Sequence, residues 1–144
     1  MNRRNGLLLI VSLVWWSASA QTLDEITSIE FLTATRGYQK QVTMTSKTLT
    51  IKTEDHRRQG KAPVVREMKK SDWDSLLHSL KDVPLAEIPL LKSPSMQRAS
   101  DGARSSSISI TTKEGAIWSH EFDNERPHEK LQPLINVITA LDKD

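Results

Sequence analysis

The sequence predicts a single α+β domain, in which two helices pack on one face of a mainly antiparallel sheet of about five or six strands. Three observations support this fold class. Apolar and polar residues alternate through short segments between positions 26 and 52, as in half-buried strands. A further pair of such segments turns at Lys113-Glu114-Gly115. Two other segments repeat apolar residues at spacings of three and four, which predicts amphipathic helices.

The first 20 residues have the three parts of a secretory signal peptide. Two arginines precede an apolar core at positions 7–16, and Ser17-Ala18-Ser19-Ala20 fits a cleavage site before Gln21. A transmembrane helix needs about 20 apolar residues, and this core is about half as long. We therefore expect residues 1–20 to be removed and residues 21–144 to form the domain. The mature protein would then be exported, to the periplasm or the extracellular medium.

Positions 26–68 are expected to form four strands. Threonine-rich segments with one apolar face are separated by a turn at Arg36-Gly37 and a break at Ser46-Lys47. The polar stretch 54–62 is expected to be a loop, and 64–68 a fourth strand. The residues that share one face of the first three strands are Ile29, Phe31, Thr33, Val42, Met44, Leu49 and Ile51.

The first helix is expected to begin at Ser71, whose hydroxyl can cap the free N–H groups of the first turn. It should end before Pro84, because the residue preceding a proline disfavours helical geometry. His78 lies off its apolar stripe and should face solvent. That stripe contains Trp73, Leu76, Leu77 and Leu80.

Residues 84–104 contain three prolines and form the least regular part of the predicted domain. The closing helix should start near Leu131, because Pro133 lacks a backbone donor and fits only a first turn. Its apolar stripe contains Leu131, Leu134, Ile135, Ile138 and Leu141. The core is expected to include Trp73, Leu77, Ile110, Phe122, Leu134 and Ile138.

Composition excludes several classes of function. The chain has no cysteine, so neither disulfides nor thiol chemistry are available. Without the leader, its 18 basic and 18 acidic side chains balance, which removes any argument for a nucleic-acid partner. Charge is uneven along the chain, with ten basic and six acidic residues in 21–70 against eight and twelve in 71–144. The halves can attract each other within one domain, or a basic patch at His56, Arg57, Arg58 and Lys61 can meet an anionic partner.

An ordered set of short motifs resembles a family of small exported bacterial α+β proteins. The set comprises Ser93-Pro94-Ser95, Asp101-Gly102-Ala103, Ile108 with Ile110, Phe122-Asp123, and Pro127 before an apolar helix. No activity is assigned to that family, so the resemblance implies export and an α+β fold. Its pattern has a tyrosine where this chain has Trp118, and His-Gly where it has Asn124-Glu125. A site built on that histidine therefore does not transfer to this chain.

The order of elements is also similar to that of small bacterial inhibitors of thermolysin-like metallopeptidases. This likeness is one of layout, and layout alone does not fix function.

Few residues suggest chemistry. His128-Glu129 begins a zinc-peptidase motif, but Gln132 stands where the second histidine ligand would be. Ser105-Ser106-Ser107 lacks the surroundings of a nucleophile elbow and fits the entrance to a strand. We therefore expect no metal and no cofactor, and we identify no catalytic residue.

The remaining candidate site combines Asp101 and Gly102 with Asp123 and Asn124. If the loop and the end of the hairpin meet, two carboxylates could bind a ligand or act as an acid and a base. Asp-Gly and Asp-Asn are also common turn dipeptides, so both pairs can be purely structural.

The sequence favours an exported, non-catalytic, monomeric binding module for a protein or a small ligand. One specific form would be an inhibitor of an extracellular enzyme. After signal cleavage we expect no association with membranes or nucleic acids. The alternative is a small hydrolase that uses Asp101 and Asp123.

Overall fold

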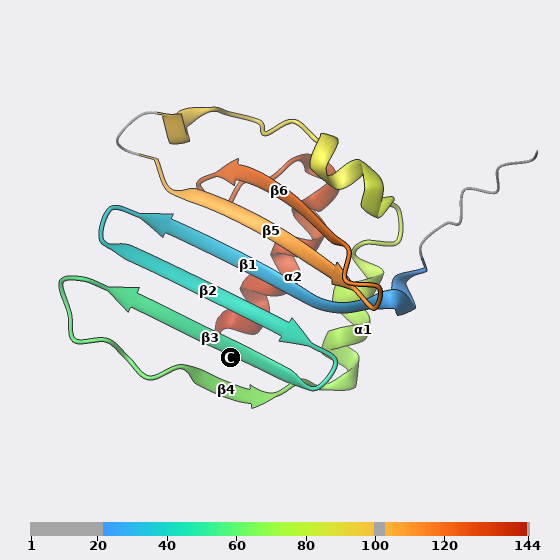
Figure 1. Cartoon of the computed structure of the whole chain (residues 1–144), viewed down its shortest axis with the longest axis horizontal. Helices are drawn as coiled ribbons and strands as arrows, with labels where there is room; N and C mark the ends of the chain where they lie inside the picture. The colour runs from blue at the N-terminus through green and yellow to red at the C-terminus, as the bar shows by residue number, and fades with distance from the viewer. Residues whose placement is uncertain (1–21, 100–102, 144) are drawn as a thin grey trace, which may run out of the picture.

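The computed structural model describes residues 22–99 and 103–143, so the expected signal peptide and two candidate site residues, Asp101 and Gly102, lie outside the described residues. The described chain forms one antiparallel six-stranded sheet in the order β4-β3-β2-β1-β5-β6. Two α-helices, α1 and α2, cover the same face of this sheet (Figure 1). The predicted α+β fold class is confirmed.

The first three strands form the predicted meander. Gly37 has a φ of 79°, which suits glycine at the tight turn between the first two strands. A polar loop leads from the third strand to a short fourth strand at the edge of the sheet. The bounds are β1 (Ile26–Thr35), β2 (Tyr38–Thr45), β3 (Thr48–Asp55) and β4 (Val64–Glu67).

The chain then crosses the sheet and returns on the far side of β1. β5 (Ser105–Thr112) pairs with β1, and β6 (Ile117–Asp123) pairs with β5 through the predicted hairpin. Ile29 of β1 therefore lies between Met44 of β2 and Ile110 of β5. This places β1 in the interior of the sheet, with a local partner on one side and a distant one on the other.

The helices form where the apolar stripes predict, but the first helix differs at both ends. It stops at His78, so Leu80 lies in the turn that follows it and Pro84 is not what ends it. α1 (Lys70–His78) is preceded by Lys69, which makes no side-chain capping bond, so Ser71 lies inside the helix and is not its cap. The Ser71 carbonyl instead accepts a hydrogen bond from the Ser75 hydroxyl at 2.8 Å. α2 (Gln132–Lys143) follows a short 3-10 turn, η4 (Glu129–Leu131), which leaves Pro133 in the first helical turn as expected.

The core lies between the sheet and the two helices. Five of the six residues predicted for it are buried: Trp73, Ile110, Phe122, Leu134 and Ile138. Leu77 is only partly buried, and Leu76 fills the central position on α1 instead. His78 is exposed, as predicted.

The segment between the first helix and β5 is more ordered than its prolines suggested. It contains two 3-10 helices, η2 (Leu85–Leu90) and η3 (Gln97–Ala99), and both pack against β6 (Figure 1). Leu85 and Ile88 are buried, which holds η2 in place. This segment therefore covers one edge of the sheet. At the start of the described chain, η1 (Leu23–Glu25) leads into β1.

The face of the sheet opposite the helices is open and rich in hydroxyl groups. One row across it contains Thr43 and Thr50 on one side of Glu30, and Ser109 and Ser119 on the other. The Ser109 and Ser119 hydroxyls are 2.9 Å apart. Such a face stays hydrated, so burial of apolar side chains is concentrated on the helix side.

Candidate functional site

The chain leaves β6 through a tight turn at Asp123–Arg126. The Arg126 N–H donates to the Asp123 carbonyl at 2.9 Å, and φ is 52° at Asn124 and 60° at Glu125. Positive φ at both central positions defines a type I′ turn, which normally carries Asn-Gly because glycine has no Cβ to clash. Within the described residues these two are the non-glycine residues with positive φ. The conformation is therefore costly at Glu125, whereas asparagine is a favoured residue at the position of Asn124.

Asp123 is buried at the start of this turn, with 2% of its surface exposed. Its Oδ2 accepts hydrogen bonds from the Ser95 hydroxyl at 2.5 Å and from the Gln97 N–H at 2.6 Å. Hydrogen bonds to a carboxylate are about twice as strong as neutral ones. Asp123 therefore fastens the segment before β5 to the end of β6.

Asn124 connects three parts of the chain. Its N–H donates to the Arg104 carbonyl at 2.8 Å, and its Oδ1 accepts from the Arg104 N–H at 3.0 Å. Its side-chain amide donates to Gln97 Oε1 at 3.0 Å. The side chain thereby lies fixed between the entrance to β5 and η3.

Glu125 is held through both its backbone and its side chain. Its N–H donates to Ser106 Oγ at 3.2 Å, and that hydroxyl lies 3.2 Å from Thr33 Oγ1 inside the sheet. Its carboxylate forms an ion pair with Arg104 at 3.2 Å, with both side chains partly exposed. Thr35, Arg104, Asn124 and Glu125 line a polar pocket of about 340 Å³. We call this pocket the turn pocket.

Of the four candidate residues from the sequence, Asp123 and Asn124 lie together at this turn, while Asp101 and Gly102 lie outside the described residues. Sequence reasoning missed five further residues: Thr35, Ser95, Gln97, Arg104 and Glu125. Of these, only Glu125 could have been noticed in the sequence, because it follows Asn124 at the position where a tight Asn-Gly turn has glycine. Ser95 and Gln97 gave no such signal, because their link to Asp123 exists only in the fold.

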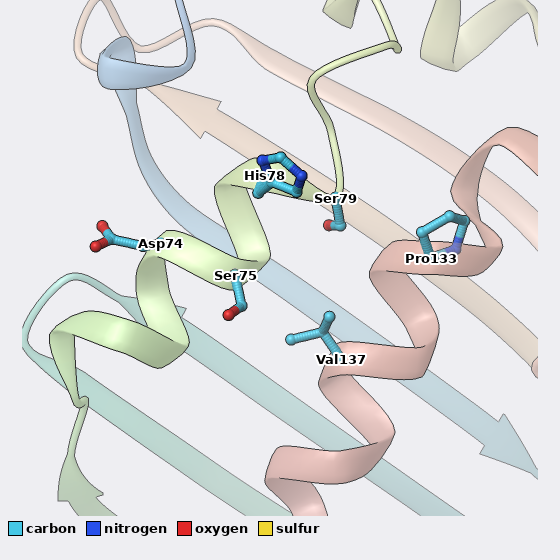
Figure 2. A pocket seen from close by; sticks show the side chains of 6 residues that line it. All are labelled: Asp74, Ser75, His78, Ser79, Pro133 and Val137. Atoms are coloured by element: carbon cyan, nitrogen blue, oxygen red, sulfur yellow. The ribbon is translucent and has the colours of Figure 1, made fainter.

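A second hollow lies between the helices, on their side away from the sheet. It has a volume of about 540 Å³ and is lined by Asp74, Ser75, His78, Ser79, Pro133 and Val137. Val137 and Pro133 of α2 lie across from Ser75 of α1 and from Ser79, which follows that helix, whereas the Asp74 carboxylate points away from α2 (Figure 2). Lys70 pairs with that carboxylate at 2.6 Å. The hollow is therefore an open surface groove without a converging set of polar groups.

No group of three or more histidine, aspartate or glutamate side chains is arranged to hold a metal ion in the part of the chain that the structure describes. Among the helices at positions 22–99 and 103–143, none has the length and apolar character needed to cross a membrane.

Comparisons of the chain with protein-family models, with curated proteins and with solved structures found no match. Any functional conclusion therefore depends on the site itself.

Proposed function

We propose that the protein is an exported, non-catalytic binding module that recognises a protein partner through the turn pocket. The observation that carries this proposal is Glu125, which lines the pocket beside Asn124 and has a left-handed φ of 60° at the position where a type I′ turn favours glycine. A left-handed conformation costs a non-glycine residue about 1–2 kcal/mol. Such strain tends to be kept at binding and active sites, where it holds side chains in a required arrangement.

The chemistry of the turn pocket supports binding over catalysis. Its lining offers a guanidinium, a carboxylate, an amide and a hydroxyl, which are all groups able to donate or accept hydrogen bonds. A pocket for a small organic ligand is instead mostly apolar. Polar groups held in fixed positions on a surface suit the edge of a protein interface, where they provide specificity.

The state of Asp123 also favours a non-catalytic role. Its carboxylate is buried, its Oδ2 accepts hydrogen bonds from Ser95 and Gln97, and it is not among the residues that line the turn pocket. A catalytic carboxylate must reach the proton that it transfers.

A pair of variants tests the role of the turn pocket. Glu125→Gly should relieve backbone strain while removing the carboxylate, and Glu121→Gln changes an exposed carboxylate elsewhere on β6. The parent and each variant are immobilised and incubated with the exported fraction of the producing cells. We expect the parent and Glu121→Gln to retain the same partner protein. Glu125→Gly should lose it while remaining folded. Equal retention by all three would contradict the proposal.

The inhibitor form of the proposal has its own test, suggested by the likeness in layout to metallopeptidase inhibitors. The protein should reduce peptide hydrolysis by a thermolysin-like enzyme, and Glu125→Gly should reduce it less. Hydrolysis of an ester, peptide or glycoside by the protein alone, abolished by Asp123→Asn, would instead favour the hydrolase alternative.

A further inference from the structure

The two edges of the sheet differ in how they are protected. η2 and η3 pack along β6, whereas β4 forms the opposite edge of the sheet. Val64 and Val65 of β4 are 55% and 63% exposed. An exposed edge strand with apolar side chains is a template for pairing with another extended chain.

The pairing register defines which backbone groups of β4 face outward. The Met68 N–H donates to the Lys47 carbonyl at 2.9 Å, and the same register continues from Thr48–Glu67 to Ile51–Val64. Hydrogen-bonded and non-hydrogen-bonded pairs alternate in an antiparallel ladder. Because Lys47 and Met68 are a hydrogen-bonded pair, Thr48–Glu67 and Thr50–Val65 are non-hydrogen-bonded pairs. The N–H and C=O groups of Val65 and Glu67 are therefore directed away from β3, available to an additional strand.

The charged residue at the middle of this edge does not shield it. Arg66 is in register with Leu49, on the side of the sheet that faces the helices, and its Nη2 donates to the Leu141 carbonyl near the end of α2. Charged side chains on an edge strand, including those that point inward, are among the devices that protect it from pairing. Here that arginine is instead used to hold the end of a helix.

The surroundings of the edge are basic. Positions 52–70 contain seven basic and three acidic side chains, and Arg57, Arg58 and Lys61 are exposed in the loop before β4. Lys52 is paired with Glu54 at 2.6 Å. A second copy of this chain would bring an equally basic edge against the first, which disfavours self-pairing. An acidic segment would meet complementary charge.

We propose that the β4 edge binds an extended, acidic segment of a protein partner as an additional strand of the sheet. The backbone of Val65 and Glu67 supplies the hydrogen bonds, Val64 and Val65 supply apolar contact on the two faces, and the basic loop supplies charge complementarity. The β4 edge lies across the sheet from the turn pocket, so this inference does not depend on the proposed function.

The probe is a short peptide in which valine and glutamate alternate, compared with one in which lysine replaces glutamate. Val65→Pro removes an outward N–H without removing a ladder hydrogen bond, and Val65→Thr is its control because it keeps that N–H. Arg57→Glu combined with Lys61→Glu reverses the charge of the loop without altering β4. Binding is measured by fluorescence anisotropy at low and high salt, with the circular dichroism of each variant recorded.

We expect the acidic peptide to bind the parent and Val65→Thr, and its Kd to rise by roughly tenfold or more in Val65→Pro and in the charge-reversed variant. High salt should weaken binding to the parent. The proposal is overturned if the acidic peptide does not bind, if the lysine peptide binds equally well, or if folded Val65→Pro binds like the parent. Concentration-dependent dimers that Val65→Pro abolishes would instead identify a second copy as the occupant.

Discussion

Glu125 occupies the position at which a type I′ turn favours glycine. Glu125→Gly removes the left-handed strain of about 1–2 kcal/mol. It also adds backbone freedom to the unfolded chain and removes a surface ion pair, each of which costs up to about 1 kcal/mol. These terms largely cancel, so we expect the free energy of unfolding in urea denaturation to stay within about 1 kcal/mol of the parent value.

Glu125→Ala is the control for this prediction, because it keeps the strained backbone and removes only the side chain that pairs with Arg104. It should be slightly less stable than the parent. If Glu125→Gly loses more than about 2 kcal/mol, the carboxylate is a structural anchor and the strain argument is wrong.

Asp123 should matter more for stability than any exposed carboxylate on the same strand. In Asp123→Asn the amide can present only one acceptor oxygen, and its NH₂ would face the Ser95 and Gln97 donors if it were turned the other way. We expect the free energy of unfolding to fall by about 1.5–3 kcal/mol. Glu121→Gln should leave it unchanged, and equal stability of the two variants would mean that Asp123 does not hold the segment around η3.

Glu54 provides a prediction about pH. Its hydrogen bond and ion pair with Lys52 lower the pKa of its carboxyl below the usual value of 4.5. A lowered pKa stabilises the folded state above the unfolded pKa, and this contribution disappears as the pH falls through the folded pKa. Because Glu54 is exposed, the effect is small. NMR titration should show the pKa returning toward 4.5 in Lys52→Gln; an unchanged pKa would exclude Lys52 as its cause.

At the scale of elements, α1 distinguishes two adjacent leucines. Leu76 is fully buried, whereas Leu77 lies at the margin of the core. Leu76→Ala should therefore reduce the free energy of unfolding by about 2–5 kcal/mol. Leu77→Ala should cost clearly less, and chemical denaturation of the two variants measures the difference. The reverse order would mean that α1 is rotated relative to this structure.

The error at Leu77 illustrates what periodicity can and cannot predict. Spacing of three and four identifies an apolar stripe, but Trp73, Leu76, Leu77 and Leu80 share it, and only packing decides which of them lies at its centre. The cap at Ser71 was wrong for a related reason. The helix starts at Lys70 with Lys69 in the capping position, so Ser71 lies inside the first turn, where its carbonyl accepts a hydrogen bond from the Ser75 hydroxyl.

The strands were more predictable, because alternation along β1, β2 and β5 reports directly which face is buried. The turn pocket was only partly predictable. Asp123-Asn124 indicated a turn, but the donors to Asp123 come from residues 95 and 97, on a segment whose prolines predicted irregular structure. Contacts between segments distant in the sequence leave no periodic signal.

At the scale of the whole molecule, the proposed export gives a direct prediction. Expression of the full sequence in a bacterial host should yield a protein in the exported fraction whose mass corresponds to a chain starting at Gln21. Intact-mass spectrometry measures this, and Ala20→Leu should impair cleavage because the site requires small residues. A chain that keeps Met1 and stays in the membrane fraction would instead identify the leader as an anchor.

The position of β1 has a consequence for how the molecule folds. β1 can pair with β2 as soon as both have been synthesised, but its other partner, β5, lies about 80 residues further along, as Ile29 and Ile110 illustrate. Pairing across such a separation is slow, because the entropy of closing the loop is lost before the contact forms. Docking of the β5–β6 hairpin should therefore limit the folding rate, and until it occurs β1 is an exposed strand open to aggregation.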